Sequence, residues 1–328
     1  MARDGKVDIF ENDIPEQLLG ILLRDHTTGR NIFWACDDYE ALGKGYAFGD
    51  TIELAAITGD NSNVIMPRVM KDKSLKKKRA KEKAEIFTPA WLCNEMCNAT
   101  DEPLLAEGCC FNRPFEEDGR HDWEVSDEPL RFAEGKTWQD YICQNCLEIT
   151  CGEAPFLVSR YDAVSGEPIP IGKRIGLLDR KIRVAGENTN GIDEWLRWVI
   201  QSFKSTYGYE WQGDNILLAR ENMLFTFIEY HEARWGTTPG ADLLVQVAEI
   251  VSWNIFQMDG LKMVIPNSCR NGVVEKKTQD IFGGEEVVYC EGCRKDIPLK
   301  HNGIATKIMD WENNRPIEFR SLYGRGKK

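Results

Sequence analysis

The clearest pattern of apolar and polar positions lies between Cys146 and Arg160. A short apolar segment meets a turn of small residues, Thr150 to Ala154, and a new apolar run from Pro155 to Val158 follows at once. This order predicts a strand, a tight turn and a helix with Pro155 in its first turn. In open α/β sheets a ligand binds at the carboxyl end of such a strand, because glycine lets the backbone approach it and the next helix presents its N-terminus.

A further helix and a second strand are predicted downstream. Apolar residues at helical spacing indicate a helix over 193–203, and the strand that follows ends at Glu210. The apolar stretch 216–229 contains neither Gly nor Pro, so it predicts a buried helix that is capped near Asp214.

A third strand, over 251–256, follows a helix that begins at residue 242, and it leads to Asp259. Parallel strands joined by helices bring their carboxyl ends to one edge of the sheet, so we expect Glu148, Glu210 and Asp259 to lie together there. An acid at the second strand end suits a ribose, and an acid at the third suits an adenine amino group. This order of acids predicts a nucleoside-like ligand.

Composition and charge narrow the class of protein. The 328 residues allow one large or two modest domains, and the net charge of −12 argues against binding of nucleic acid over the whole surface. The sequence shows no signal-peptide pattern and no apolar run long enough to span a membrane. We therefore expect a cytoplasmic protein without a membrane partner.

A basic segment, Lys71 to Lys83, holds the densest charge in the chain. Such a segment either contacts phosphates, where counterion release drives salt-dependent binding, or forms a solvated helix or linker. It runs directly into Thr88 and Pro89, which predict the cap and the first turn of a helix. The predicted nucleic-acid contacts within the segment are Lys76, Lys77, Lys78 and Arg79.

Three other stretches have a distinct character. The first 60 residues indicate a small mixed unit with a strand over 31–35, followed by Asp37 and Asp38, which form either a solvated turn or a functional carboxylate pair. Residues 100–140 are rich in Glu, Asp, Pro and Gly and predict an irregular insertion. Residues 307–319 have a hairpin-like pattern.

The residues at these turns resemble the S-adenosylmethionine site of adenine-specific DNA methyltransferases. The resemblance rests on the order of four segments: Thr88-Pro89, Glu148 to Leu157, Tyr207 to Glu210 with Leu218-Ala-Arg-Glu-Asn222, and Asp259-Gly-Leu. It points in particular to methylation subunits of type I restriction-modification systems. The chain is also similar, over nearly its whole length, to bacterial and phage (bacteriophage) proteins labelled as restriction endonuclease M subunits.

The resemblance implies a Rossmann-like fold, S-adenosylmethionine as cofactor, and DNA and another protein subunit as partners. Carried over position by position, it places Thr88 and Pro89 at the amino acid end of the cofactor. It implies a loop around the cofactor that is formed by Glu148, Cys151, Gly152 and Phe156. It also implies that Glu210 contacts the ribose and that Asp259 contacts the adenine.

Two replacements and one absence separate the sequence from that family. Glu148-Ile149 stands where the family has Asp-Pro, and Ala154-Pro155 stands where a second glycine is usual. An Asn-Pro-Pro-Tyr or Asp-Pro-Pro-Tyr motif, which holds the target amino group and stacks on the extruded base, is not found after Asp259.

Two hypotheses follow from the resemblance and its departures. The first is a methyltransferase of the adenine type that acts on DNA and whose base-holding element is unrecognised or supplied by a partner. The second is a noncatalytic protein of the same fold that binds DNA or a partner, as a regulator, a subunit or a phage antagonist of host defence.

The 11 cysteines are expected to be mostly reduced thiols, because no secretory signal accompanies them. Cys290 and Cys293 have the spacing of a zinc ribbon half-site, and Cys143 and Cys146 have the same spacing. A structural zinc site from the two pairs, a site from Cys290, Cys293, His301 and one further ligand, and free buried thiols all agree with the sequence.

The predicted fold class is α/β, a Rossmann-like fold of S-adenosylmethionine-dependent methyltransferases with an N-terminal extension and a small C-terminal module. We expect the extension with its basic segment over 1–84 and the cofactor domain over 85–265, with an insertion around 162–205. The remaining residues, 266–328, form the small module that holds the candidate zinc ligands.

Overall fold

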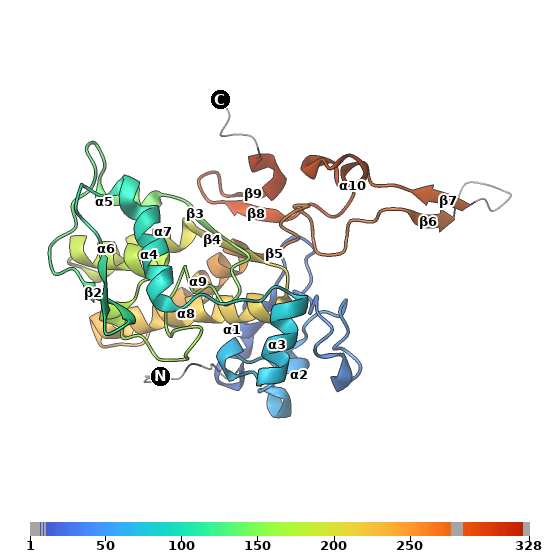
Figure 1. Cartoon of the computed structure of the whole chain (residues 1–328), viewed down its shortest axis with the longest axis horizontal. Helices are drawn as coiled ribbons and strands as arrows, with labels where there is room; N and C mark the ends of the chain where they lie inside the picture. Colours follow the sequence, from blue (N-terminus) through green and yellow to red (C-terminus); the bar gives the residue numbers. More distant parts are fainter. Residues whose placement is uncertain (1–6, 8, 10, 277–284, 324–328) are drawn as a thin grey trace.

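A computed structural model describes residues 7, 9, 11–276 and 285–323 (Figure 1). Within these residues the chain is a mixed α/β protein with small sheets. Its helices are α1 (Glu16–Leu23), α2 (Leu54–Ile57), α3 (Lys73–Glu82), α4 (Ala90–Asp101), α5 (Trp138–Cys143), α6 (Leu177–Asn188), α7 (Ile192–Lys204), α8 (Gly213–Trp235), α9 (Ala241–Asn254) and α10 (Glu291–Lys295). Its strands are β1 (Asn112–Glu117), β2 (Arg120–Val125), β3 (Cys146–Ile149), β4 (Thr206–Glu210), β5 (Ile255–Gln257), β6 (Val273–Lys276), β7 (Glu285–Val288), β8 (Lys307–Asp310) and β9 (Arg315–Glu318).

The central sheet has three parallel strands in the order β3-β4-β5. Gly208 of β4 lies opposite Glu148 of β3 on one side and Ile255 of β5 on the other. Glycine fits this crowded position, because a Cβ there would lie 3.1 Å from both the Cys151 Sγ and the Ile255 Cδ1. The prediction that three parallel strands bring their carboxyl ends to one edge is confirmed.

The helices predicted around β4 are also confirmed, with small changes at their ends. The helix before the strand, α7, buries Trp195, Val199 and Phe203, the apolar stripe that predicted it. The helix after it, α8, is buried along most of its length and packs on β4 and β5. Figure 1 shows α8 as the long helix that runs beside the sheet. Asp214 lies inside α8 rather than at its cap, which is Gln212.

The prediction of a helix directly after β3 is wrong. Residues 150–176 form turns, bends and one short 3-10 segment, and the next helix is α6. The backbone φ angles of Thr150, Gly152 and Ala154 are +50°, +54° and +63°, so alternate residues occupy the left-handed region and interrupt any helix there. The loop stays irregular until Leu177.

Other sequence-based predictions need smaller corrections. Residues 31–35 contribute only isolated bridges, from Asn31 to Arg24 and from Phe33 to Thr51, instead of a strand. Most of the strand predicted over 251–256 belongs to α9, and β5 begins at Ile255. The region predicted to be irregular contains the β1-β2 hairpin, whereas the hairpin predicted over 307–319 is confirmed as β8-β9.

The main core joins the N-terminal residues to the sheet. Ile9, Leu22 and Trp34 belong to the same buried cluster as Leu217 of α8 and Ile255 of β5. The N-terminal stretch of the predicted three-part division therefore packs with the sheet rather than by itself. In contrast, β6, β7 and α10 project away from the body of the molecule (Figure 1). No helix in the described part of the chain is both long and apolar enough to cross a membrane.

Candidate functional site

At the end of β4, the Glu210 carboxylate is bonded within the protein. Its Oε2 accepts a hydrogen bond from the Gly152 N–H at 3.0 Å, and its Oε1 accepts from the N–H groups of Trp211 at 2.6 Å and Gln212 at 3.3 Å. Burial raises the pKa of Glu210, although these three N–H groups act to lower it. The side chain that was predicted to hold a ribose therefore ties the glycine loop to β4 in this structure.

At the end of β5, Asp259 stabilises the turn that follows the strand. Its Oδ1 accepts from the N–H groups of Leu261 and Lys262, both at 3.1 Å, and its Oδ2 lies 3.6 Å from the Lys262 Nζ. Gly260 fits inside this turn because a Cβ would lie only 2.5 Å from the Tyr209 hydroxyl oxygen. Asp259 thus has a structural role that needs no ligand.

An N-terminal segment covers the glycine loop. The ring of Phe87 approaches Gly152 so closely that a Cβ there would lie 3.1 Å from it, and the Arg68 guanidinium stacks 5.2 Å from the centre of the same ring. The Arg68 N–H donates to Glu153 Oε1 at 2.5 Å. Cys151, which was predicted to be in the cofactor loop, is buried against Gly208.

Beside β3, in contrast, the structure has a cavity. A cavity of about 770 Å³ is lined by three residues of the predicted cofactor set, Thr88, Glu148 and Phe156, and by neither Glu210 nor Asp259. Pro89 is the N-cap of α4, one position later than the cap predicted at Thr88. The structure therefore divides the predicted cofactor residues between a cavity and a closed, internally bonded strand end.

The Glu148 carboxylate is the unsatisfied group of this cavity. Its Oε2 is buried and has no hydrogen-bond partner among the described residues. Burial raises the pKa of Glu148 well above its ordinary value, although the N–H groups of Phe156 and Leu157 act to lower it. A buried acceptor without a partner is unusual in folded proteins and marks a position where a ligand can donate a hydrogen bond.

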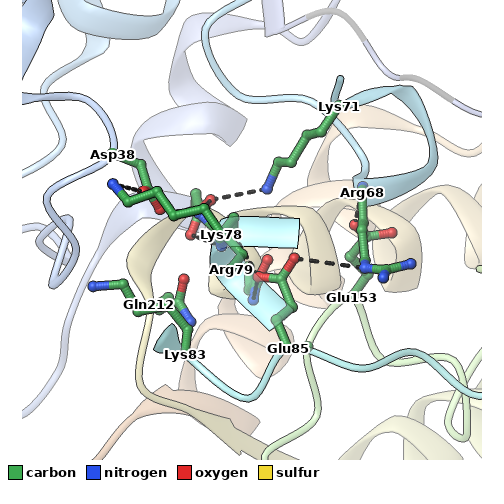
Figure 2. Close-up of polar contacts among 12 residues, drawn as sticks. Asp38, Arg68, Lys71, Lys78, Arg79, Lys83, Glu85, Glu153 and Gln212 are labelled. Carbon is green, nitrogen blue, oxygen red and sulfur yellow. Dashed lines mark hydrogen bonds and ion pairs between the residues drawn. The ribbon is translucent and has the colours of Figure 1, made fainter. Parts of the chain in front are cut away.

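The buried face of α3 carries charges that are paired inside the protein (Figure 2). The Arg79 guanidinium, which is 0% exposed, lies 3.0 Å from Asp38, 2.6 Å from Glu85 and 2.9 Å from Asp214. The Lys71 Nζ lies 3.1 Å from Asp214. Burial acts to raise the pKa of Asp214, but Arg79 and Lys71 outweigh it and hold this pKa below its usual range.

The acidic pair after the predicted strand belongs to the same network. The Lys78 Nζ lies 2.8 Å from Asp38, and the Lys83 Nζ lies 2.9 Å from Asp37. Asp37 and Asp38 are therefore ion-pair partners of α3. Arg79 is closed to a phosphate in this structure, and Lys78 is already paired.

The solvent-facing side of α3 keeps a basic stripe. Lys73, Lys77 and Lys81 are exposed and lie four residues apart, so they share one face of the helix. Lys76 is directed back to the Val69 carbonyl at 2.6 Å. Of the four predicted nucleic-acid contacts, Lys77 is the one that the structure leaves exposed.

A Cys3His cluster in the C-terminal part forms a candidate metal site. Cys269, Cys290 and Cys293 offer Sγ atoms and His301 offers Nδ1, all within 4.8 Å of one another. The Cys269 Sγ lies 3.4 Å from the Cys290 Sγ and 3.6 Å from the Cys293 Sγ, and Nδ1 lies 3.4 to 3.5 Å from all three sulfurs. Zinc bonds of about 2.3 Å to sulfur and about 2.0 Å to nitrogen place tetrahedral ligands about 3.5–3.8 Å apart. This group can therefore bind a metal such as zinc.

The backbone around the cluster supports a thiolate. Burial acts to raise the pKa of Cys290, but the backbone N–H groups of Cys293 and Asn302, with the neighbouring Cys269 and His301, lower it to about 6. A Cβ on Gly292 would lie 2.6 Å from the backbone nitrogen of His301 and 2.8 Å from its Nδ1, so glycine lets α10 approach that residue.

The sequence identified Cys290 and Cys293 and the nearby His301, but it missed Cys269. That residue is a lone cysteine without a spacing signal, and the folding of the chain brings it to the cluster. The alternative site made from two Cys-x-x-Cys pairs is wrong, because Cys146 lies in β3 and its Sγ contacts the Ser205 carbonyl at 3.6 Å.

No protein-family model, no curated protein and no solved structure matches the chain.

Proposed function

We propose that the chain binds S-adenosylmethionine beside β3 and acts on DNA as an adenine-type methyltransferase or as part of a restriction-modification system resembling its methylation subunits. The observation that supports this most is the buried Glu148 Oε2 without a partner, beside a cavity that Thr88 and Phe156 also line. The cofactor carries an ammonium and a sulfonium group. An unpaired buried carboxylate favours such a cation, because an opposite charge offsets its desolvation.

The residues of the cavity fit the amino acid end of the cofactor. Glu148 supplies an acceptor, Thr88 a hydroxyl group and Phe156 an apolar surface, and the volume of about 770 Å³ suits a small molecule. Glu210 and Asp259 fit the adenosine end less well, since their oxygens already accept backbone N–H groups. A carboxylate oxygen has a second lone pair, so in this proposal each acid keeps its bonds and adds one to the ligand.

When bound, the cofactor supplies the methyl group. The side chains of this protein hold the cofactor, and Glu148 pairs with its ammonium group. The stripe Lys73, Lys77 and Lys81 on α3 provides the phosphate contacts, in place of the buried Arg79.

A second candidate is a noncatalytic protein that binds DNA or a partner. The observation that favours it is in the sequence: the 328 residues contain no two consecutive prolines, so the base-holding motif of amino methyltransferases is not present in them. Engagement of Glu210 and Asp259 in backbone hydrogen bonds favours it too.

A methyl-transfer assay separates the two candidates. Duplex DNA is incubated with S-adenosylmethionine labelled in its methyl group and with the chain, alone and together with the products of neighbouring genes. The first candidate predicts label in adenine that is lost in Glu148→Ala. Cofactor binding without any transfer supports the second candidate, and failure to bind the cofactor contradicts the proposed site.

A further inference from the structure

We infer that the outer edge of β3 is a docking site for an extended apolar strand of another polypeptide. The inference goes beyond the proposed function. The strand and the cofactor would share the cavity of about 770 Å³, so the strand is tested on the protein without the cofactor. It rests on the backbone of β3, on the cavities beside the strand and on the side chains exposed there.

β3 is an edge strand, since β4 is its one neighbour in the described sheet. The Cys146 N–H donates to the Ser205 carbonyl, and the register continues through Glu148 opposite Gly208. In a parallel ladder alternate residues turn their N–H and C=O groups to the same neighbour, so those of Leu147 and Ile149 face the outer edge. The Ile149 carbonyl accepts the Thr150 hydroxyl at 2.7 Å. The two N–H groups and the Leu147 carbonyl are available to a further strand.

Cavities lie on both faces of this edge. One, of about 820 Å³, is lined by Leu147 together with Tyr207 and Phe256, which the register places on the same face of the sheet. The other, of about 770 Å³, is lined by Glu148, whose side chain points to the opposite face. The linings share Asn145, Cys146 and Leu147. The two cavities therefore flank the same open edge.

Exposed apolar side chains gather at these cavities. Ile149 is 64% exposed although it belongs to the central sheet. Five large apolar residues are exposed in the two linings: Ile86, Met96, Leu147, Ile149 and Leu322. Apolar side chains that gather on a surface in this way mark an interaction site.

The strand also lacks three of the devices that protect a free edge. Natural edge strands carry lysine, proline or a bulge that prevents pairing with other chains. β3 contains neither lysine nor proline, and its register with β4 has no bulge. Its one charged residue, Glu148, has a buried carboxylate oxygen and lines the cavity of about 770 Å³. The edge is therefore competent to pair.

The surroundings specify the strand that fits. Successive side chains of an added strand point to opposite faces and so enter the two cavities in turn. Both linings offer large apolar groups, among them Trp198 and Phe319 in one and Leu104 and Phe156 in the other. A run of about five consecutive apolar residues meets this requirement, as in strands that are buried on both faces. Outside the described residues this chain has no more than two apolar residues in a row, so the strand comes from another polypeptide.

Hydrogen exchange of the full chain tests the inference. The probe is the peptide acetyl-Lys-Val-Ile-Val-Ile-Val-Lys-amide. In the free protein the N–H groups of Leu147 and Ile149 should exchange faster than those of Cys146 and Glu148, which the ladder protects. With saturating peptide the first two should slow by about tenfold or more. Protection of Leu147 and Ile149 in the free monomer, or no binding of the peptide, overturns the inference.

Two kinds of variant make the test specific. Ile149→Pro removes an outward N–H without removing a bond to β4, and it should weaken peptide binding about tenfold or more. Ile149→Val keeps the N–H and should bind the peptide like the wild type. If the proline variant fails to fold, the peptide with alternate N-methylated amides replaces it on the wild-type protein. Unchanged binding of the N-methylated peptide, or pairing of two copies of the chain through this edge, contradicts the inference.

Discussion

The two sides of the small parallel sheet differ in how their polar groups are satisfied. At the ends of β4 and β5, Glu210 and Asp259 accept hydrogen bonds from backbone N–H groups. Little of their hydrogen-bonding capacity is therefore left for a ligand. Beside β3, the Glu148 Oε2 is buried without a partner and the strand edge is open. Three acids near the carboxyl ends of three parallel strands thus have different chemistry. A motif position alone does not tell which of them can bind a ligand.

A second contrast concerns two acids: Asp214, which is buried in the ion-pair network of α3, and Glu148 beside β3, whose Oε2 is buried. Arg79 and Lys71 hold the pKa of Asp214 below its usual range despite burial. Burial without a cation raises the pKa of Glu148. Their protonation should therefore affect stability in opposite directions, and this difference can be measured.

The largest expected effect comes from removing the metal that we place in the Cys3His cluster. That cluster stabilises the segment next to the Asp259 turn, because Ile265 donates its N–H to Ile304 at 2.9 Å. Structural zinc contributes about 10–16 kcal/mol in zinc-finger peptides, so chelation or Cys293→Ser should unfold this module locally. Elemental analysis should show one zinc ion per chain in the wild type and none in Cys293→Ser, and exchange of the 285–305 amides should rise. Cys143→Ser is the matched control, and loss of zinc from it would be inconsistent with this site.

The next largest change in stability is expected from breaking the buried ion-pair network of α3. Asp214→Ala leaves Arg79 and Lys71 buried with fewer partners, and breaking a buried ion pair in this way costs about 3–5 kcal/mol. Chemical denaturation should show this loss, whereas Lys77→Ala on the exposed face should change the free energy of unfolding little. Because the pKa of Asp214 is lowered in the folded protein, its contribution to the free energy of unfolding is present above about pH 4 and is lost as the pH falls. A variant as stable as the wild type would contradict the role of the network.

A smaller change in stability, of opposite sign, is expected from replacing Glu148 beside β3. Because the pKa of Glu148 is raised in the folded protein, its contribution to the free energy of unfolding is present below about pH 4.5. This contribution is lost as the pH rises through the folded-state pKa. Glu148→Gln should therefore be more stable than the wild type at pH 8 and nearly equal at pH 4, and the difference at pH 8 should be about 1–3 kcal/mol, the usual cost of a buried polar group without a partner. Denaturation at both pH values checks this, with the exposed Glu95→Gln as control. Lower stability of Glu148→Gln at pH 8 would show that the carboxylate is paired.

The smallest effect belongs to the exposed stripe of α3. Lys77→Ala should change stability by less than about 0.5 kcal/mol, as is usual for a surface substitution. If the stripe contacts phosphates, the slope of log affinity for duplex DNA against log salt should fall by about 1 in this variant. Titration by fluorescence anisotropy at several salt concentrations measures the slope. An unchanged slope would exclude Lys77 from the interface.

Periodicity was sufficient to predict that three parallel strands occur and that helices lie before and after β4, but not the bounds of β5. The stripe of Trp195, Val199 and Phe203 and the long apolar stretch of α8 are local signals, and local signals survive folding. The helix after β3 was mispredicted because the left-handed residues Thr150 and Ala154 have no reliable mark in the sequence.

The candidate sites were less predictable, because they depend on residues far apart in the chain. The density of lysines in α3 indicates a basic surface, yet Arg79 pairs with Asp214, 135 residues away. Cys269 joins a cluster whose other members lie 21 to 32 residues further on. Which side of α3 is buried, and which cysteine completes the cluster, follow from tertiary packing alone.

Calorimetry of the full chain with S-adenosylmethionine and its demethylated product tests the central claim most directly. We predict one binding site, affinity at least about tenfold weaker in Glu148→Gln, and binding that weakens as the pH falls through the raised pKa of Glu148, because protonation removes the negative charge that pairs with the cofactor. Asp259→Ala should weaken binding as well if the adenine reaches the end of β5. Absence of binding by both ligands, or equal affinity in the wild type and Glu148→Gln, would contradict the proposed cofactor site.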